Sequence, residues 1–233
     1  FGNGWRRRRE ALRRLLLDAG GDIICTQEGL RQQLDYIDEF LPEFGYVGVA
    51  RDDGVSKGEH CAIYYNRSLL EELRCGTFWL SETPETYLQT WDGPFKRICT
   101  WMMVRTITAK AAIWVFNTHF PLNAWARPRA ARLLLDKIQE FAGSEAIILA
   151  GDFNCGPRSV PWKMFHDSGL RNAQVALGQP LQNTQCAFGI PMFCLDGIFV
   201  SRDLNVLNCR VLDQSVQGIY PSDHFGILAE IDM

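Results

Sequence analysis

The stretch AIILAGDFNCG, residues 146–156, joins a short apolar run to two polar residues that follow it closely. An unbroken apolar run of this length, ended by glycine, is typical of a strand that is buried on both faces of a sheet. Gly151 allows the chain to turn where it leaves the sheet, so a rigid element delivers Asp152 and Asn154 to the sheet edge. Alone, an Asp-x-Asn sequence more often forms a turn in which these side chains cap backbone groups. Whether Asp152 and Asn154 form a turn or part of a functional site therefore depends on polar residues elsewhere in the chain.

The length allows one large domain or two small ones, and because no linker or internal repeat is visible we expect one domain over residues 1–233. Hydrophobic residues make up 47% of the chain, and the net charge is −3. This charge excludes a generally basic protein that coats nucleic acid, so any polyanion must bind to a local patch. No apolar run approaches the roughly 18 residues of a membrane-spanning helix, and we expect no membrane span. The lack of a signal-like segment favours the cytoplasm, and the sequence specifies no oligomeric state.

The eight cysteines contain no Cys-x-x-Cys pair, which argues against a zinc site. Several of them lie in apolar runs, where a thiol usually acts as a small core residue. A chain of this length does not need disulfides for stability, and we expect mostly free thiols.

Apolar periodicity predicts an alternation of helices and strands without a strict repeat. Helices are predicted over residues 6–18, 30–41, 128–141 and 161–168. Strands are predicted over residues 22–27, 46–50, 61–65, 97–106, 112–118, 146–150, 187–194, 196–201, 206–212 and 225–231, with a further strand inside 69–79. This order favours two sheets packed face to face with helices outside them. Six arginines crowd the first helix; a solvated face and a phosphate-binding patch are both compatible with them.

Polar residues stand at the ends of several of these apolar runs. They are Glu28, His119, Asp152, Asn154, Asp196, Asp223 and His224. One such residue could be a cap, but so many give up stabilising apolar burial that a common site explains them better. The carboxylates are hard oxygen ligands of the kind that Mg²⁺ or Mn²⁺ accepts.

Five short motifs in this set resemble those of the endonuclease/exonuclease/phosphatase superfamily, which includes deoxyribonuclease I. The motifs are Thr26-Gln27-Glu28, Asn117-Thr118-His119, Gly151-Asp152-Phe153-Asn154, Leu195-Asp196-Gly197-Ile198-Phe199-Val200 and Ser222-Asp223-His224. Within the superfamily, FWLSETP at residues 78–84 and the segment from Trp91 to Trp101 look like a bacterial-type group of metal-dependent hydrolases. The resemblance implies a four-layer α/β-sandwich of two packed mixed sheets with helices outside.

The resemblance also implies roles for the metal-binding and hydrolytic residues. Glu28 would hold the divalent cation, Mg²⁺ or Mn²⁺, with Asp223 as a second acidic contributor. Asp152 would align or deprotonate the attacking water. Asp196 would orient His224 and favour its charged form, which can bind a phosphoryl oxygen.

Further residues would bind the phosphate. Asn154 would donate its amide to phosphate or help to position the water, and His119 would be a second phosphate-facing imidazole. In the deoxyribonuclease branch a glutamate supports that histidine and an arginine contacts phosphate. Glu59 and Arg97 match these two positions, although an ordinary loop acid and a surface charge are the alternatives.

The sequence departs from the family pattern in two places. The family opens with a strand that carries a metal-binding Asn, and Asn3 does not fit this position because it precedes a glycine. We therefore expect the first strand of one sheet to be missing from an N-terminally truncated domain. The segment after His119, FPLNAW, also lacks the charged residues of the bacterial-type group, so substrate choice could differ.

The leading hypothesis is thus a Mg²⁺-dependent phosphoesterase that cleaves a phosphodiester, as nucleases do, or a phosphomonoester by in-line attack of water. Nucleic acid, phosphoinositide and sphingomyelin-like lipid are the substrate alternatives. A binding or scaffold domain with an impaired site is the competing hypothesis, because the missing strand would remove a metal ligand.

Overall fold

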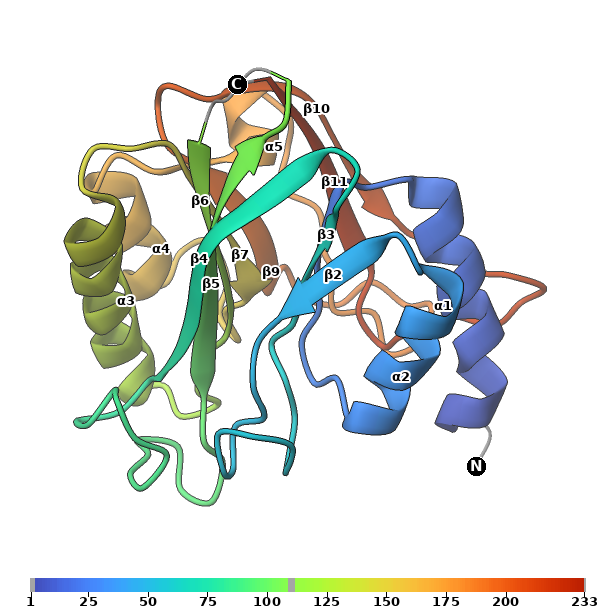
Figure 1. Cartoon of the computed structure of the whole chain (residues 1–233), viewed down its shortest axis with the longest axis horizontal. Helices are drawn as coiled ribbons and strands as arrows, with labels where there is room; N and C mark the ends of the chain where they lie inside the picture. Colours follow the sequence, from blue (N-terminus) through green and yellow to red (C-terminus); the bar gives the residue numbers. More distant parts are fainter. Residues whose placement is uncertain (1–2, 109–111, 233) are drawn as a thin grey trace.

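The computed structural model describes residues 3–108 and 112–232, which form two layers of strands between two layers of helices (Figure 1). The larger sheet has six strands in the order β4-β5-β6-β7-β9-β8. These strands are β4 (Leu70–Trp79), β5 (Ile98–Thr106), β6 (Ala112–His119), β7 (Ile147–Asp152), β8 (Arg171–Asn172) and β9 (Asp196–Val200). The sheet is mixed, because β6 and β7 are parallel while their neighbours are antiparallel.

The second strand layer consists of a three-stranded and a two-stranded sheet. Its strands are β1 (Ile23–Cys25), β2 (Phe44–Val47), β3 (Ile63–Asn66), β10 (Asn205–Leu212) and β11 (Gly226–Asp232). The strands pair antiparallel in both of these sheets, and together the two sheets form the layer that faces the six-stranded sheet. The packing of two strand layers is confirmed, because buried side chains of both layers join in one core cluster.

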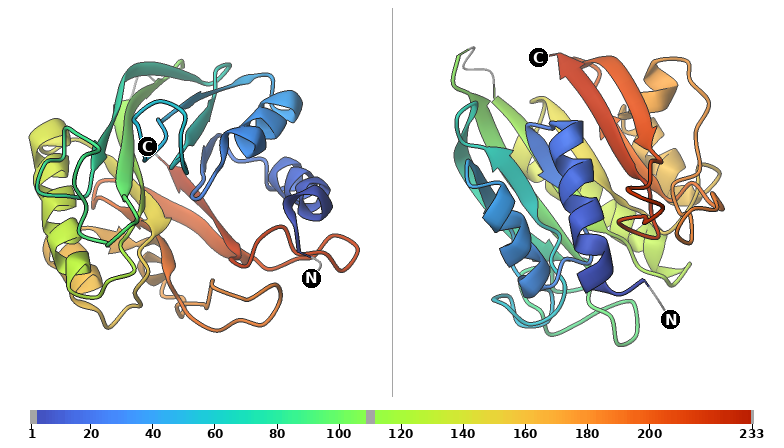
Figure 2. Two further views of the ribbon diagram at one scale, coloured as in Figure 1. Left: turned by 90° about the horizontal axis from the view of Figure 1, so that it is seen from below. Right: turned by 90° about the vertical axis from the view of Figure 1, so that its right-hand side faces the viewer.

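Helices cover the outer face of each layer, as the two turned views show (Figure 2). They are α1 (Trp5–Ala19), α2 (Arg31–Phe40), α3 (Ala126–Ala142), α4 (Val160–Asp167) and α5 (Ala173–Ala176). The apolar stripe of α3 includes Leu134 and Ile138, which pack with α4 against the six-stranded sheet. Leu34 and Ile37 of α2 pack against Tyr64 of the three-stranded sheet. Among the described residues, none of these helices has the length and apolar character needed to cross a bilayer.

The central strands β6 and β7 are buried on both faces, as the sequence predicted for residues 146–150. Along β6, Trp114 and Phe116 enter the core under α3, while Ile113 and Val115 enter the core between the two layers. Strand β7 alternates in the same way, which follows from the two-residue period of a strand. A Cβ at Gly151 would collide with the carbonyl oxygen of Thr118, so this glycine also permits the close approach of β7 to β6.

Some predicted elements differ from the structure. The strand predicted over residues 187–194 is wrong, because this segment is a turn followed by irregular chain. Ala187 and Phe188 have positive φ angles of 40° and 63°, which no extended strand allows. The short elements β8 and α5 were not predicted, because two to four residues are too few to show a periodicity.

Candidate active site

Three of the predicted site residues form one row across neighbouring strands. His119 on β6 is paired in register with Asp152 on β7, and Asp152 is paired with Asp196 on β9. Residues paired in register on adjacent strands project to the same face of a sheet. They lie an even number of residues from Val115, Ile148 and Ile198 on the same strands, and these three side chains enter the core between the layers. The row therefore ends the inner face of the six-stranded sheet, opposite the second strand layer.

His224 completes the row from the second layer, two residues before the start of β11. Its Nδ1–H donates to Oδ2 of Asp196 at 2.8 Å. Burial opposes the charged imidazolium, but the hydrogen bond and charge of Asp196, with Asp152 and Asp223 nearby, raise the pKa of His224 to about 9. The ring is therefore a cation at neutral pH, held in one orientation by a carboxylate.

Asp152 lies at the centre of the row and is buried. Its Oδ1 accepts the backbone N–H of Asn154 at 2.8 Å, and its Oδ2 lies 3.6 Å from Nε2 of His119. Burial, together with the negative charge of Asp196, raises the pKa of Asp152 to about 7. A carboxylate with this pKa can take a proton from water near neutral pH.

Asn154 lies beside Asp152 with a φ of 49°, a left-handed conformation that asparagine tolerates better than most residues. Its Nδ2 donates to the carbonyl oxygen of Phe120 at 2.8 Å, which ties the segment after β6 to the turn after β7. The same amide nitrogen carries a second N–H that can be offered to a phosphate oxygen.

Glu28, Glu59 and His119 form a cluster next to the row. One ligand atom from each lies within 4.8 Å of the others, and Oε1 of Glu28 is 4.0 Å from Nε2 of His119. The side chain of Glu28 is 66% exposed, but partial desolvation by its surroundings, with the charges of Glu59 and Asp223, raises its pKa. A divalent cation would offset the repulsion between these carboxylates, and their oxygen atoms are donors that suit Mg²⁺ or Mn²⁺.

His119 itself is neutral. Burial, followed by the charges of Arg97 and Arg51, holds its pKa well below the usual value. The ring therefore has one N–H to donate and one lone pair, in contrast to the charged ring of His224.

Glu28 adopts a left-handed backbone conformation with a φ of 59°. A non-glycine residue in this region costs about 1–3 kcal/mol, and such positions cluster at functional sites. We expect Glu28→Gly to raise the free energy of unfolding by about 1 kcal/mol, because the change relieves this strain and removes a crowded carboxylate. Urea denaturation without divalent metal measures it, and Mn²⁺ should bind the variant more weakly. A less stable variant would show that Glu28 is not strained.

Glu59 and Arg97 both lie near His119, but Glu59 does not form the direct support of His119 that the resemblance implies. Glu59 lies close to His119, but its ion pair is with Arg51. Nη1 of Arg97 lies 3.0 Å from each ring nitrogen of His119. A small pocket brings these groups together; it is lined by Glu28, Arg51, Glu59, His60, Cys61, Lys96, Arg97, Ile98 and His119.

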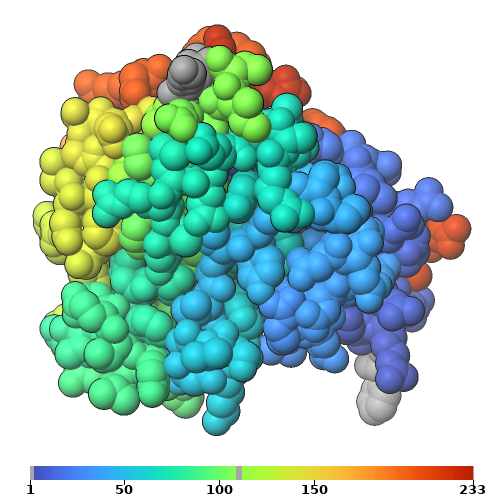
Figure 3. All heavy atoms as spheres, viewed as in Figure 1, coloured from blue at the N-terminus to red at the C-terminus, as the bar shows by residue number. Residues whose placement is uncertain are grey.

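Several residues of the site were given no role from the sequence. Arg51 and Lys96 line the pocket, and Nζ of Lys96 donates to the carbonyl oxygen of Asp52, so the segments 51–59 and 81–97 meet at one edge of the molecule (Figure 3). Asn117 lies two residues before His119 on the same face of β6. Its Nδ2 donates to the carbonyl oxygens of Thr26 and Ala62 and so joins the two layers beneath the site. The polar residue Asn117 inside an apolar run was the available signal.

The sequence and the fold of this chain have relatives among known proteins. A sequence model of the Endonuclease/Exonuclease/phosphatase family matches residues 1–224. A mannosyl-6-phosphatase from Bacteroides thetaiotaomicron is similar in structure, with a TM-score of 0.92, 31% identity, and coverage of 100% of this chain and 93% of that chain. An endonuclease/exonuclease/phosphatase from Bacteroides vulgatus has a TM-score of 0.93 at 28% identity, covering 99% and 92%.

More distant proteins share the fold. The human nocturnin catalytic domain has a TM-score of 0.79 at 18% identity, with coverage of 98% of this chain and 86% of that chain. Among curated sequences, an uncharacterized protein of Acanthamoeba polyphaga mimivirus is 30% identical over 158 residues, which are 64% of this chain. The match spans 59% of the length of that relative.

Proposed function

Because the chain belongs to the endonuclease/exonuclease/phosphatase family, we propose that it is a divalent-metal-dependent phosphoesterase that cleaves a P–O bond by in-line attack of water. The observation that carries this proposal is the row of His119, Asp152 and Asp196. It connects the carboxylate cluster at one end to the Asp196–His224 pair at the other.

The acidic groups would hold the metal. Glu28 would be the principal ligand and Asp223 a second contributor, with Glu59 close by. When bound, Mg²⁺ or Mn²⁺ supplies a Lewis acid that neutralises a phosphate oxygen and the leaving oxyanion.

The remaining residues act on the water and the phosphoryl group. Asp152 accepts a proton from the attacking water, for which its raised pKa is suited. The imidazolium of His224, held by Asp196, donates to a phosphoryl oxygen whose negative charge it stabilises. Asn154, His119 and Arg97 offer N–H groups to the remaining oxygens, and Glu59 keeps Arg51 in the pocket.

A small, exposed phosphomonoester, such as a sugar phosphate, fits the available observations best among the substrate classes. The relative with 31% identity is a phosphatase by name, and the net charge of this chain is −3. The arginines of α1 also have local partners: Arg8 contacts the carbonyl oxygen of Pro221, and Arg13 and Arg14 pair with Glu10. A nuclease and a lipid or inositol phosphate phosphoesterase are the alternatives.

A substrate panel tests the proposal. Hydrolysis of p-nitrophenyl phosphate, bis-p-nitrophenyl phosphate, a hexose 6-phosphate, an inositol phosphate and single-stranded DNA is measured with Mg²⁺ or Mn²⁺. We expect hydrolysis that stops with EDTA and returns with Mn²⁺, and a hexose phosphate turned over faster than DNA. If no phosphate ester is hydrolysed with either metal, a binding or scaffold domain with an impaired site becomes the better account.

A further inference from the structure

A buried carboxylate outside the row, Asp92, binds two separate parts of the site. Its Oδ2 accepts from Nε of Arg97 and from the backbone N–H of Leu122, both at 3.0 Å, and its Oδ1 accepts from the N–H of Asn123 at 2.8 Å. The side chains of Asp92 and Arg97 are only 3% and 5% exposed. A buried ion pair of this kind is costly unless its remaining hydrogen-bonding groups are satisfied, as they are for this carboxylate.

The first connection leads to the phosphate pocket. Nε of Arg97 is occupied by Asp92, and Nη1 lies against the ring of His119. A guanidinium is planar, so fixing Nε and Nη1 fixes the direction of its other N–H groups. Asp92 itself belongs neither to the cluster around Glu28 nor to the row around Asp152.

The second connection leads to the segment that follows His119. Asn154 holds the start of this segment at the carbonyl oxygen of Phe120, and Asp92 holds its middle at Leu122 and Asn123. Two apolar side chains of the segment, Leu122 and Trp125, are 53% and 50% exposed. Asp92 thus connects residues 120–125, which follow His119, to the guanidinium of Arg97.

We propose that Asp92 is a positioning residue for phosphate recognition, which acts by fixing the guanidinium of Arg97 against His119 and by holding residues 120–125 beside it. This inference rests on the proposed function, because it takes Arg97 as a phosphate-binding group. Asp92 is not a catalytic residue, since its carboxylate is fully engaged by Arg97 and two backbone amides.

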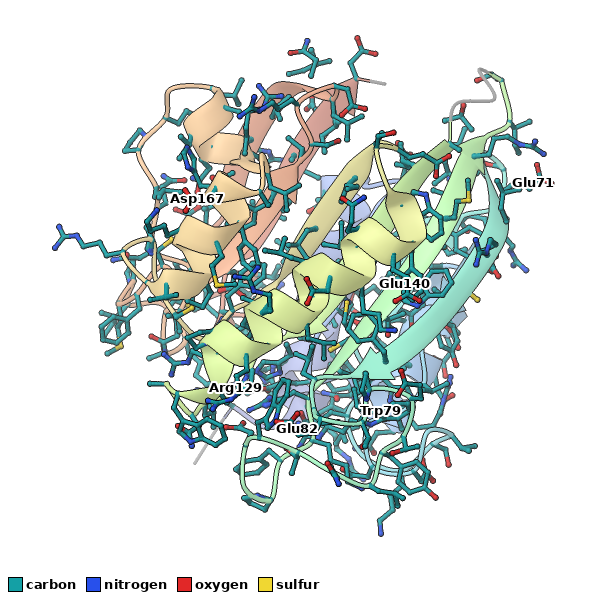
Figure 4. The ribbon with its side chains drawn as sticks, turned by 90° about the vertical axis from the view of Figure 1, so that its left-hand side faces the viewer. Glu71, Trp79, Glu82, Arg129, Glu140 and Asp167 are labelled. Carbon is teal, nitrogen blue, oxygen red and sulfur yellow. The ribbon has the colours of Figure 1, made fainter. Side chains whose placement is uncertain are left out.

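A four-protein cycle tests the coupling: wild type, Asp92→Asn, Arg97→Gln and the double variant. For each, isothermal titration gives the Kd of inorganic phosphate in the presence of Mg²⁺, and kinetics give kcat and KM for the best substrate of the panel. Glu82→Gln is the matched control, because Glu82, labelled in Figure 4, lies between β4 and β5 as Asp92 does, and accepts from Nε1 of Trp91. Asp92→Glu keeps the charge and guards against a failure of Asp92→Asn to fold.

We expect Asp92→Asn to raise both the phosphate Kd and KM about tenfold, as the loss of one charge-assisted hydrogen bond predicts. It should add less than twofold in the Arg97→Gln background, because the two residues act through one group. Asp92→Glu should lie between wild type and Asp92→Asn, and Glu82→Gln should match wild type.

Other results decide against the inference. If wild type is active but both Asp92 variants bind phosphate within twofold of it, or if the two effects simply add, the positioning role is overturned. The same follows if neither Asp92 variant unfolds cooperatively, since the carboxylate then serves folding alone. A wild type that hydrolyses no phosphate ester overturns the proposed function instead, and this inference with it.

Discussion

Replacing Asp152 by asparagine is expected to lower kcat about 10³-fold on whichever phosphate ester proves best, while the fold is kept. Asparagine has the same shape, and its Oδ1 can still accept the backbone N–H of Asn154. The loss is therefore confined to the charge and basicity of the carboxylate, and a positioned base contributes about 10²–10⁴-fold. Steady-state kinetics with saturating Mg²⁺ or Mn²⁺ measure it.

A matched control is available in Asp167→Asn. Asp167, labelled in Figure 4, is an exposed carboxylate at the end of α4 that pairs with Lys163. Its replacement should change kcat by less than twofold. If Asp152→Asn also stayed within threefold of wild type, the base would have to be sought elsewhere.

The raised pKa of Asp152 also predicts that the Asp152→Asn substitution, which lowers activity, stabilises the fold at alkaline pH. A carboxyl group whose folded pKa is about 7 binds its proton more tightly in the folded state than in the unfolded chain, where its pKa is about 3.9. This stabilisation is present below the unfolded value and is lost as the pH rises through about 7. Without divalent metal at pH 8, Asp152→Asn should therefore unfold at a higher temperature than wild type, and wild-type activity should fall below about pH 7.

The strand that delivers Asp152 was predictable because its signals are local. The run of residues 146–150 reads as a strand buried on both faces, and β7 covers Ile147–Asp152. The family resemblance is confirmed and supplied the grouping of distant motifs, which periodicity alone does not give. What the register adds is the order within the site, since it sets His119 beside Asp152 and Asp152 beside Asp196.

Other features depend on contacts between distant segments, which the sequence does not reveal. Asp92 lies in an irregular polar stretch, and its importance follows from amides 30 and 31 residues away. Glu59 was expected to support His119, yet its charge is shared with Arg51, a partner that no spacing rule identifies. Residues 187–194 have the composition of a strand, but the turn at Ala187 and Phe188 depends on backbone hydrogen bonds to Cys186.

Asp196→Asn is expected to change the pH dependence of catalysis more than its maximum rate. The carboxylate of Asp196 accepts from Nδ1 of His224 and is the main reason why the pKa of His224 reaches about 9 in spite of burial. Without this charge the pKa should fall toward the ordinary histidine value of about 6.5. At pH 8 the charged fraction of the ring would then drop about 30-fold, whereas at pH 6 it would hardly change. The ratio of wild-type to variant kcat/KM should follow this difference.

Stability provides the independent check on this assignment. A histidine whose folded pKa is raised contributes stability that is fully present below about pH 6.5 and is lost as the pH rises through about 9. Asp196→Asn removes this contribution, so wild type and variant should differ in thermal stability at pH 6 and converge above pH 9. Asp203→Asn, an exposed carboxylate after β9, should show neither effect. A rate loss that is equal at pH 6 and pH 8 would mean that Asp196 orients the ring without controlling its charge.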